Sequence, residues 1–158
     1  MSKLQRTFVI ADDLSGALDA SVSFARYGYK VRVALSPDSI LPVIESDADV
    51  VAVNTGSREV SEAVARARIA AVLKEIPHGS KIIKKIDSRL KGNICVETEV
   101  LLARGFQKIL VAPAIPTLGR IVTNGKLSGT GIGNPLVVAD IFVGLNTEVI
   151  NPDTVCDA

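Results

Sequence analysis

The chain has 158 residues, of which 47% are hydrophobic and 22% charged, which is typical of a globular protein with one sizeable core. Its 18 basic and 17 acidic residues nearly cancel, so there is no electrostatic reason to expect nucleic acid as a partner. No stretch approaches the roughly 20 apolar residues of a membrane span, the apolar run at 8–11 is too short for a signal peptide, and only Cys95 and Cys156 are present. We therefore expect a cytoplasmic protein that binds neither nucleic acid nor membrane and has no disulfide framework.

The N-terminal two thirds of the chain alternate between strand-like and helix-like segments. Short apolar runs predict strands at 7–11, 30–35, 49–53, 81–86 and 106–112. Apolar residues at helical spacing predict helices at 14–25, 60–76 and 95–103, with a short helix or loop around Pro37 and Pro42. Strands and helices that alternate in this way form parallel sheets with right-handed crossovers. The predicted fold is α/β, with a doubly wound, mostly parallel sheet of five or more strands.

The residues after Pro113 have a different character, because glycines become frequent. This composition predicts a loop-rich extension with short strands. We expect residues 1–158 to form one domain, with a core over about 7–126 and an irregular tail over 127–158. The chain stops at 155–158 as a strand emerges, which suggests a βαβ protein that is cut short and leads toward a further domain.

The first polar motif, Ala-Asp-Asp-Leu-Ser-Gly-Ala at 11–17, lies where the first predicted strand passes into a helix. Capping a helix needs only one acid, so the pair Asp12 and Asp13 is expected to accept hydrogen bonds from ligand hydroxyls or to hold a cation. Asp19 lies one helical turn behind Ser15 and could support this pair. A dinucleotide-binding loop is not expected, because its glycine spacing is absent and paired carboxylates repel a pyrophosphate.

Two further motifs follow the third and fourth predicted strands. Asn-Thr-Gly-Ser-Arg at 54–58 offers Arg58, whose planar guanidinium suits a carboxylate. Lys-Ile-Asp-Ser-Arg-Leu-Lys-Gly-Asn at 85–93 combines cations, an acid, a hydroxyl and a glycine. Lys85 and Asp87 share a side if the strand continues that far. A surface salt bridge and a solvated charged loop are the structural alternatives.

The last motif, Pro-Ala-Ile-Pro-Thr-Leu-Gly-Arg at 113–120, follows the fifth predicted strand. Its two prolines stiffen the loop, and Gly119 allows Arg120 to turn inward, although a purely structural loop is the alternative. Parallel sheets bind ligands beyond the carboxyl ends of their strands, where all of these motifs begin. The balance of cations and acids favours a small anionic ligand.

Taken together, these motifs resemble the N-terminal domain of the four-carbon acid sugar kinases, which include threonate, erythronate and 3-oxo-tetronate kinases. The resemblance runs in order over about residues 7–126. It implies that this domain holds the sugar acid, while a larger C-terminal domain binds ATP in enzymes more than twice as long. ATP and Mg²⁺ are expected only for the full-length kinase, so the partner of this chain would be an ATP-binding domain or separate chain.

The sequence departs from the family pattern in two places. The family usually has Asp-Ser-Thr-Leu-Arg-Gly where this chain has Asp-Ser-Arg-Leu-Lys-Gly at 87–92, so Arg89 and Lys91 change the size and charge of the site. Residues 128–146 match the family poorly.

The resemblance and the chemistry of a sugar acid together give a set of expected site residues. Arg58, helped by Lys85, would take the carboxylate, and Asp12 and Asp87 would accept hydroxyls and act in catalysis once a kinase domain closes. The expected substrate-binding set is Asp12, Asp13, Arg58, Lys85, Asp87, Ser88, Asn93 and Arg120. No metal site and no cofactor are expected in this chain.

Alternative functions remain open at this point. A receiver-like signalling domain also has an acidic pair after its first strand, but it needs an aspartate after the third, where this chain has Asn54. A regulatory module would bind the sugar acid without turnover, and a partial product of a longer gene is also compatible. Alone, the chain is not expected to turn over ATP, because the glycines at 128–133 lack the lysine and Ser/Thr of a phosphate-binding loop.

Overall fold

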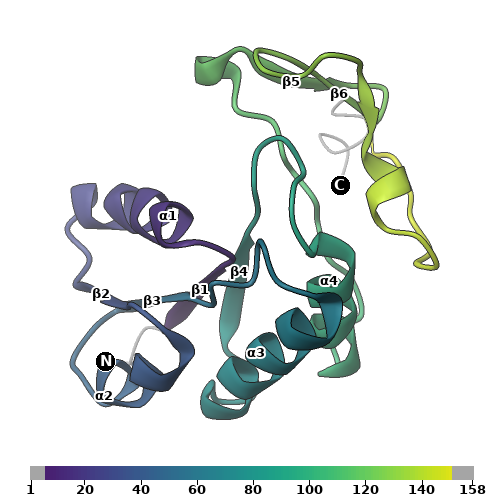
Figure 1. Cartoon of the computed structure of the whole chain (residues 1–158). Helices are drawn as coiled ribbons and strands as arrows, with labels where there is room; N and C mark the ends of the chain where they lie inside the picture. Colours follow the sequence, from purple (N-terminus) through teal and green to yellow (C-terminus); the bar gives the residue numbers. More distant parts are fainter. Residues whose placement is uncertain (1–5, 151–158) are drawn as a thin grey trace.

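A parallel four-stranded sheet forms the centre of the computed structural model, which describes residues 6–150 (Figure 1). The strand order is β2-β3-β1-β4, and every neighbouring pair is parallel. The strands are β1 (Thr7–Ala11), β2 (Val31–Ala34), β3 (Val50–Asn54) and β4 (Lys81–Lys85). The predicted α/β class and parallel pairing are therefore confirmed for these strands.

Helices cover both faces of this sheet, with α1 on one face and the others on the opposite face (Figure 1). The helices are α1 (Leu14–Arg26), α2 (Ile40–Ile44), α3 (Glu62–Glu75) and α4 (Ile94–Ala103), with a 3-10 turn at Pro37–Ser39 before α2. No helix within residues 6–150 is long and apolar enough to cross a membrane.

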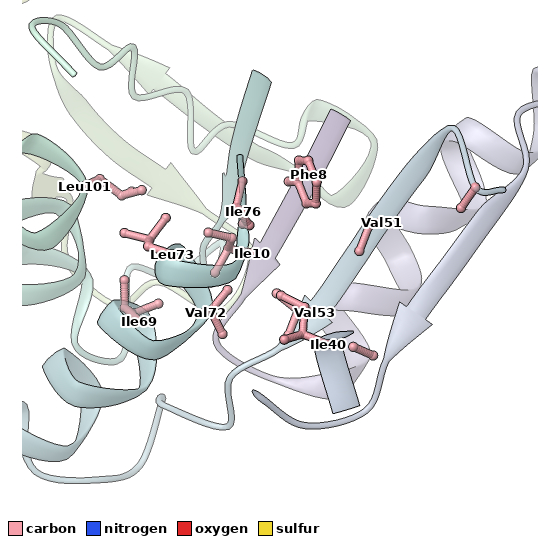
Figure 2. Packing of buried hydrophobic residues seen from close by; sticks show 12 residues of the cluster. Phe8, Ile10, Ile40, Val51, Val53, Ile69, Val72, Leu73, Ile76 and Leu101 are labelled. Atoms are coloured by element: carbon pink, nitrogen blue, oxygen red, sulfur yellow. The ribbon is translucent and has the colours of Figure 1, made fainter. Parts of the chain in front are cut away.

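Side-chain alternation along β1 explains why this strand is apolar throughout. Phe8 and Ile10 point toward α3, where they pack with Ile69 and neighbouring residues in the main core (Figure 2). Val9 points the other way and packs beneath Phe24 of α1. A strand buried on both faces needs apolar residues at successive positions, as in other two-sided parallel sheets.

The fifth predicted strand, at 106–112, is not formed, so the parallel sheet has four strands rather than five or more. The segment runs near β4 without pairing to it, and a cavity of about 400 Å³ is lined by residues of both. Phe106 packs against the main core and Val111 against a second, smaller core. The apolar pattern of the segment therefore reflects side-chain burial and not hydrogen bonding to a neighbouring strand.

A small antiparallel sheet follows, lying apart from the parallel sheet (Figure 1). It contains β5 (Arg120–Thr123), β6 (Lys126–Gly129) and β7 (Leu136–Val137), followed by a 3-10 turn at Val138–Ile141. Leu127 packs with Leu90 and Phe142 in the second core, so part of the stretch predicted as an irregular tail is ordered. The predicted terminal strand at 155–158 and Cys156 lie outside the described residues.

Candidate functional site

The carboxyl ends of three strands meet at one edge of the parallel sheet. Ala11 at the end of β1 pairs in register with Asn54 on one side and Lys85 on the other. The polar motifs that follow these strands therefore start side by side, as the sequence predicts. This edge is where open α/β sheets place their ligands.

Arg58 is held between the two acids of the first motif. Its Nε and Nη2 donate to Asp12 Oδ2 and Oδ1, each at 2.9 Å, and its Nη1 donates to Asp13 Oδ2 at 2.7 Å. Asp13 Oδ1 also accepts the backbone N–H of Gly16 at 2.7 Å and so caps α1. Hydrogen bonding to Asp12, with the nearby negative charges of Asp12, Asp13 and Asp87, raises the pKa of Arg58 above its ordinary value.

Exposure separates the two acids of this cluster. The Asp12 side chain is 2% exposed and that of Asp13 is 30% exposed, while Arg58 is 22% exposed. Both carboxylate oxygens of Asp12 face Arg58, so the geometry favours Asp13 over Asp12 for contact with a ligand. The guanidinium of Arg58 is already engaged by two carboxylates, so the sequence-based roles of Asp12 as a base and Arg58 as the carboxylate clamp stay predictions.

The loop at 86–93 folds around Asp87. Asp87 Oδ2 accepts the N–H of Arg89 at 2.9 Å and that of Lys91 at 3.3 Å, and its Oδ1 lies 4.0 Å from Arg58 Nη1. Because β4 ends at Lys85, strand alternation does not extend to Asp87. Lys85 instead donates from Nζ to Ile86 O at 2.8 Å.

The other predicted residues join neighbouring loops. Lys85 passes beside Gly16, since a Cβ at that glycine would lie 3.3 Å from Lys85 Cγ. Arg120 Nη1 donates to Ser88 Oγ at 2.6 Å, which ties β5 to the loop after β4. Asn93 Nδ2 donates to backbone oxygens of Ser57 and Val60, at 2.8 and 2.9 Å. The predicted residues thus lie in neighbouring loops, although the side-chain amide of Asn93 is engaged by backbone oxygens.

A buried polar network beneath these loops was missed by sequence reasoning. Glu97 of α4 is fully buried, its Oε2 lies 2.7 Å from Lys84 Nζ, and its Oε1 accepts a hydrogen bond from Ser57 Oγ. Ser57 Oγ is 2.7 Å from Thr55 Oγ1, which donates to Ala11 O at 2.9 Å. The signal was Glu97 within the largely apolar stretch at 94–101, since a fully buried acid requires a partner.

Two cavities of the molecule lie away from the predicted site residues. A cavity of about 580 Å³ lies between the ends of β2 and β3 and helix α3, where Asn54 and Arg68 line it. Neither this cavity nor the one beside β4 is lined by any of the predicted site residues. These cavities therefore do not coincide with the predicted site.

Comparison with known proteins places the chain in context. Residues 7–139 match the model of a family described as a sugar-binding N-terminal domain. D-threonate kinase from Cupriavidus necator is 37% identical over 85% of this chain and 32% of its own length. D-erythronate kinase from Heliobacterium modesticaldum is 34% identical over 92% of this chain and 34% of its own length. The chain spans about a third of the length of the curated relatives it matches.

A solved structure has a similar fold. A domain of unknown function from Bordetella bronchiseptica, a domain-swapped dimer with bound citrate, superposes with a TM-score of 0.66 and 27% identity. The match covers 80% of this chain and 34% of that one. These matches favour the sugar-acid interpretation of the sequence over the receiver-like one.

Proposed function

Because the chain belongs to the four-carbon acid sugar kinase family and matches its sugar-binding N-terminal domain, we propose that it binds a four-carbon sugar acid as the substrate-binding part of an ATP-dependent kinase. The observation that carries this proposal is the cluster of Asp12, Asp13 and Arg58 at the carboxyl edge of the sheet. D-threonate and D-erythronate, the substrates named for the relatives, are the first ligands to test.

Asp13 and Asp87, the two partly buried acids beside Arg58, suit the hydroxyls of the ligand. Asp13 is the more exposed acid, and Asp87 Oδ1 lies beyond hydrogen-bond distance of Arg58, so both retain acceptor capacity. In kinases that phosphorylate a hydroxyl, a carboxylate beside the nucleophile can accept its proton. In the proposal, Asp87 takes this role, and Asp12 holds Arg58 in place.

The carboxylate of the ligand calls for a cation that is not already neutralised. Lys85 gives one of its three Nζ protons to Ile86 O and has no ion-pair partner among the described residues. Arg58, by contrast, contacts two carboxylates. Lys85 is therefore the first candidate for the ligand carboxylate, with the remaining N–H groups of Arg58 as the second.

The length of the relatives fits a domain that is one part of a larger enzyme. Relatives are about three times as long as the chain, and their further residues would cover this edge and supply the nucleotide. ATP and Mg²⁺ would be held by that part of a full-length kinase.

Calorimetry of D-threonate and D-erythronate against the 158-residue protein tests the proposal. Asp13→Asn and Lys85→Met should each weaken binding by about tenfold or more, because a charged hydrogen bond is worth about 1.5–3 kcal/mol. Asp47→Asn is the matched control, since Asp47 is 68% exposed and pairs only with Lys30.

Absence of binding by either acid to the folded parent protein would contradict the proposal. Equal binding by the parent, Asp13→Asn and Lys85→Met proteins would contradict the site assignment. Binding without ADP formation, when ATP and a full-length relative's C-terminal part are supplied, would favour a regulatory module.

A further inference from the structure

Two arginines meet at a glycine-rich loop beside the proposed sugar-acid site. A Cβ at Gly131 would lie 3.6 Å from Arg120 Nη2 and 3.6 Å from Arg89 Cδ. Arg120 is fixed on its other side, where Nη1 donates to Ser88 Oγ at 2.6 Å and Nε donates to Thr130 O at 3.0 Å. The lack of a side chain at Gly131 therefore leaves room beside both arginines.

The charges in this place are not balanced. Neither Arg89 nor Arg120 lies within ion-pair distance of an acid among residues 6–150, although Arg58 nearby has three acids at that distance. The loop also offers backbone donors, because the N–H groups of Gly131 and Gly133 have no acceptor in the described part of the chain. These two donors alternate with the N–H of Ile132, which donates to Gly129 O at 3.0 Å, and Gly131 has a φ of +77°, a left-handed conformation that favours glycine.

We propose that Arg89, Arg120 and the loop at 129–133 form a subsite for a phosphate monoester dianion. Two guanidinium groups and free backbone N–H groups are the donors that recognise phosphate in proteins, since arginine binds it in a bidentate way. The oxygen-rich dianion fits better than a second carboxylate, because it accepts hydrogen bonds from several directions at once.

The position of this subsite identifies the phosphate it would receive. Ser88 follows Asp87 in the chain and is bound by Arg120, so the subsite adjoins the acids proposed to contact the ligand hydroxyls. The phosphate is thus that of a sugar acid already phosphorylated on its far hydroxyl. This assignment to a sugar acid rests on the proposed function, whereas the phosphate-binding property does not.

Inorganic phosphate is the first probe, titrated into the ¹⁵N-labelled protein while amide shifts are followed. The largest shifts are expected at the glycines of 129–133, and Arg89→Ala should weaken the affinity by about tenfold. Arg89 is exposed and bonds to Asp87 only through its backbone N–H, so Arg89→Ala should fold normally. Arg32→Ala, which removes the same charge at an exposed position of β2, is the control.

Equal phosphate affinity in the parent and Arg89→Ala proteins would overturn the proposal. An equally large loss of phosphate affinity in Arg32→Ala and Arg89→Ala would also overturn it, because the loss would then reflect net charge alone. If phosphate binds at the loop while D-threonate and D-erythronate do not bind at all, the proposed function fails and the phosphate subsite stands.

The second probe is a phosphorylated four-carbon acid, which distinguishes a sugar acid from a nucleotide as the source of the phosphate. The parent protein should bind a four-carbon acid with a terminal phosphate at least tenfold more tightly than the same acid without it, and Arg89→Ala should remove most of that difference. ATP and ADP should bind no more tightly than inorganic phosphate. Nucleotide binding that is tighter and depends on Arg89 would overturn the assignment to a phosphorylated sugar acid.

Discussion

Arg58 binds Asp12 through two parallel hydrogen bonds of 2.9 Å, so one bidentate contact joins the end of β1 to the loop after β3. Asp12 is almost fully buried, and Arg58 is its ion-pair partner. The contact therefore fixes the shape of the carboxyl edge as well as its charge.

Asp12→Asn should lower the free energy of unfolding by about 1–3 kcal/mol, because it leaves Arg58 facing a neutral amide. Urea denaturation followed by circular dichroism measures this. Asp47→Asn, which breaks the exposed pair with Lys30, should have no measurable effect. Equal stability of the Asp12→Asn and parent proteins would mean that the bidentate contact contributes nothing.

The pair formed by Glu97 and Lys84 should be strongly coupled. Lys84→Met leaves the fully buried Glu97 without its cation and should cost about 3–5 kcal/mol. The double variant Lys84→Met with Glu97→Leu should be less destabilised than the sum of the single changes, by about 0.5–3 kcal/mol. Strict additivity in a double-mutant cycle from urea denaturation would show that the two side chains act independently.

Cys95 should be a slow nucleophile. Burial, followed by the negative charges of Glu99 and Glu62, raises the pKa of its thiol, and the thiolate is the reactive form. In a Cys156→Ser variant, iodoacetamide at pH 7.5 should modify Cys95 more slowly than in the urea-unfolded chain. Glu99→Gln should speed the reaction, because it removes a negative charge that raises the pKa.

The raised pKa of Cys95 also makes the stability of the folded state depend on pH. The folded state retains the proton of Cys95 to higher pH than the unfolded state does. The stability that Cys95 contributes is therefore fully present below the ordinary thiol pKa and is lost as the pH rises through the folded-state pKa. Identical alkylation rates in folded and unfolded protein at pH 7.5 would contradict the raised pKa of Cys95 in the folded state.

Local sequence patterns predicted the parallel strands well, because burial on both faces makes each of them a short apolar run. The apolar run at 106–112 also predicts a strand, and this prediction is wrong. Phe106 and Val111 pack against the two cores, but the segment does not pair with a strand. Hydropathy reports burial, whereas a strand also requires a hydrogen-bonded neighbour.

The candidate site shows a similar limit. The ends of β1, β3 and β4 were predicted to meet, and they do. The partners within the site were not predictable from spacing, because Asp12 and Arg58 lie 46 residues apart and meet only through the strand order. Glu97 likewise bonds to Ser57, 40 residues away, and pairs with Lys84, contacts that local spacing does not indicate.

Gly92 provides a sharp test of how closely the site is packed. Its φ is +95°, and a Cβ there would lie 3.2 Å from both Arg58 Cγ and Asp12 Oδ2. Gly92→Ala should therefore add backbone strain and also push on the ion pair. Gly28→Ala is the matched control, since its φ is +85° and nothing lies within 4 Å of the added Cβ.

Both glycine variants should lose stability through strain, by roughly 1–2 kcal/mol on the scale of a left-handed residue. Only Gly92→Ala should lose more than this and also move the Arg58 Nε–H signal in a ¹H–¹⁵N spectrum, because only its Cβ contacts that side chain. This signal reports on the ion pair between Arg58 and Asp12 directly, and the measurement requires no ligand. Equal losses in the two variants, with the Arg58 signal unmoved, would show that the loop at 86–93 does not hold Arg58 against Asp12.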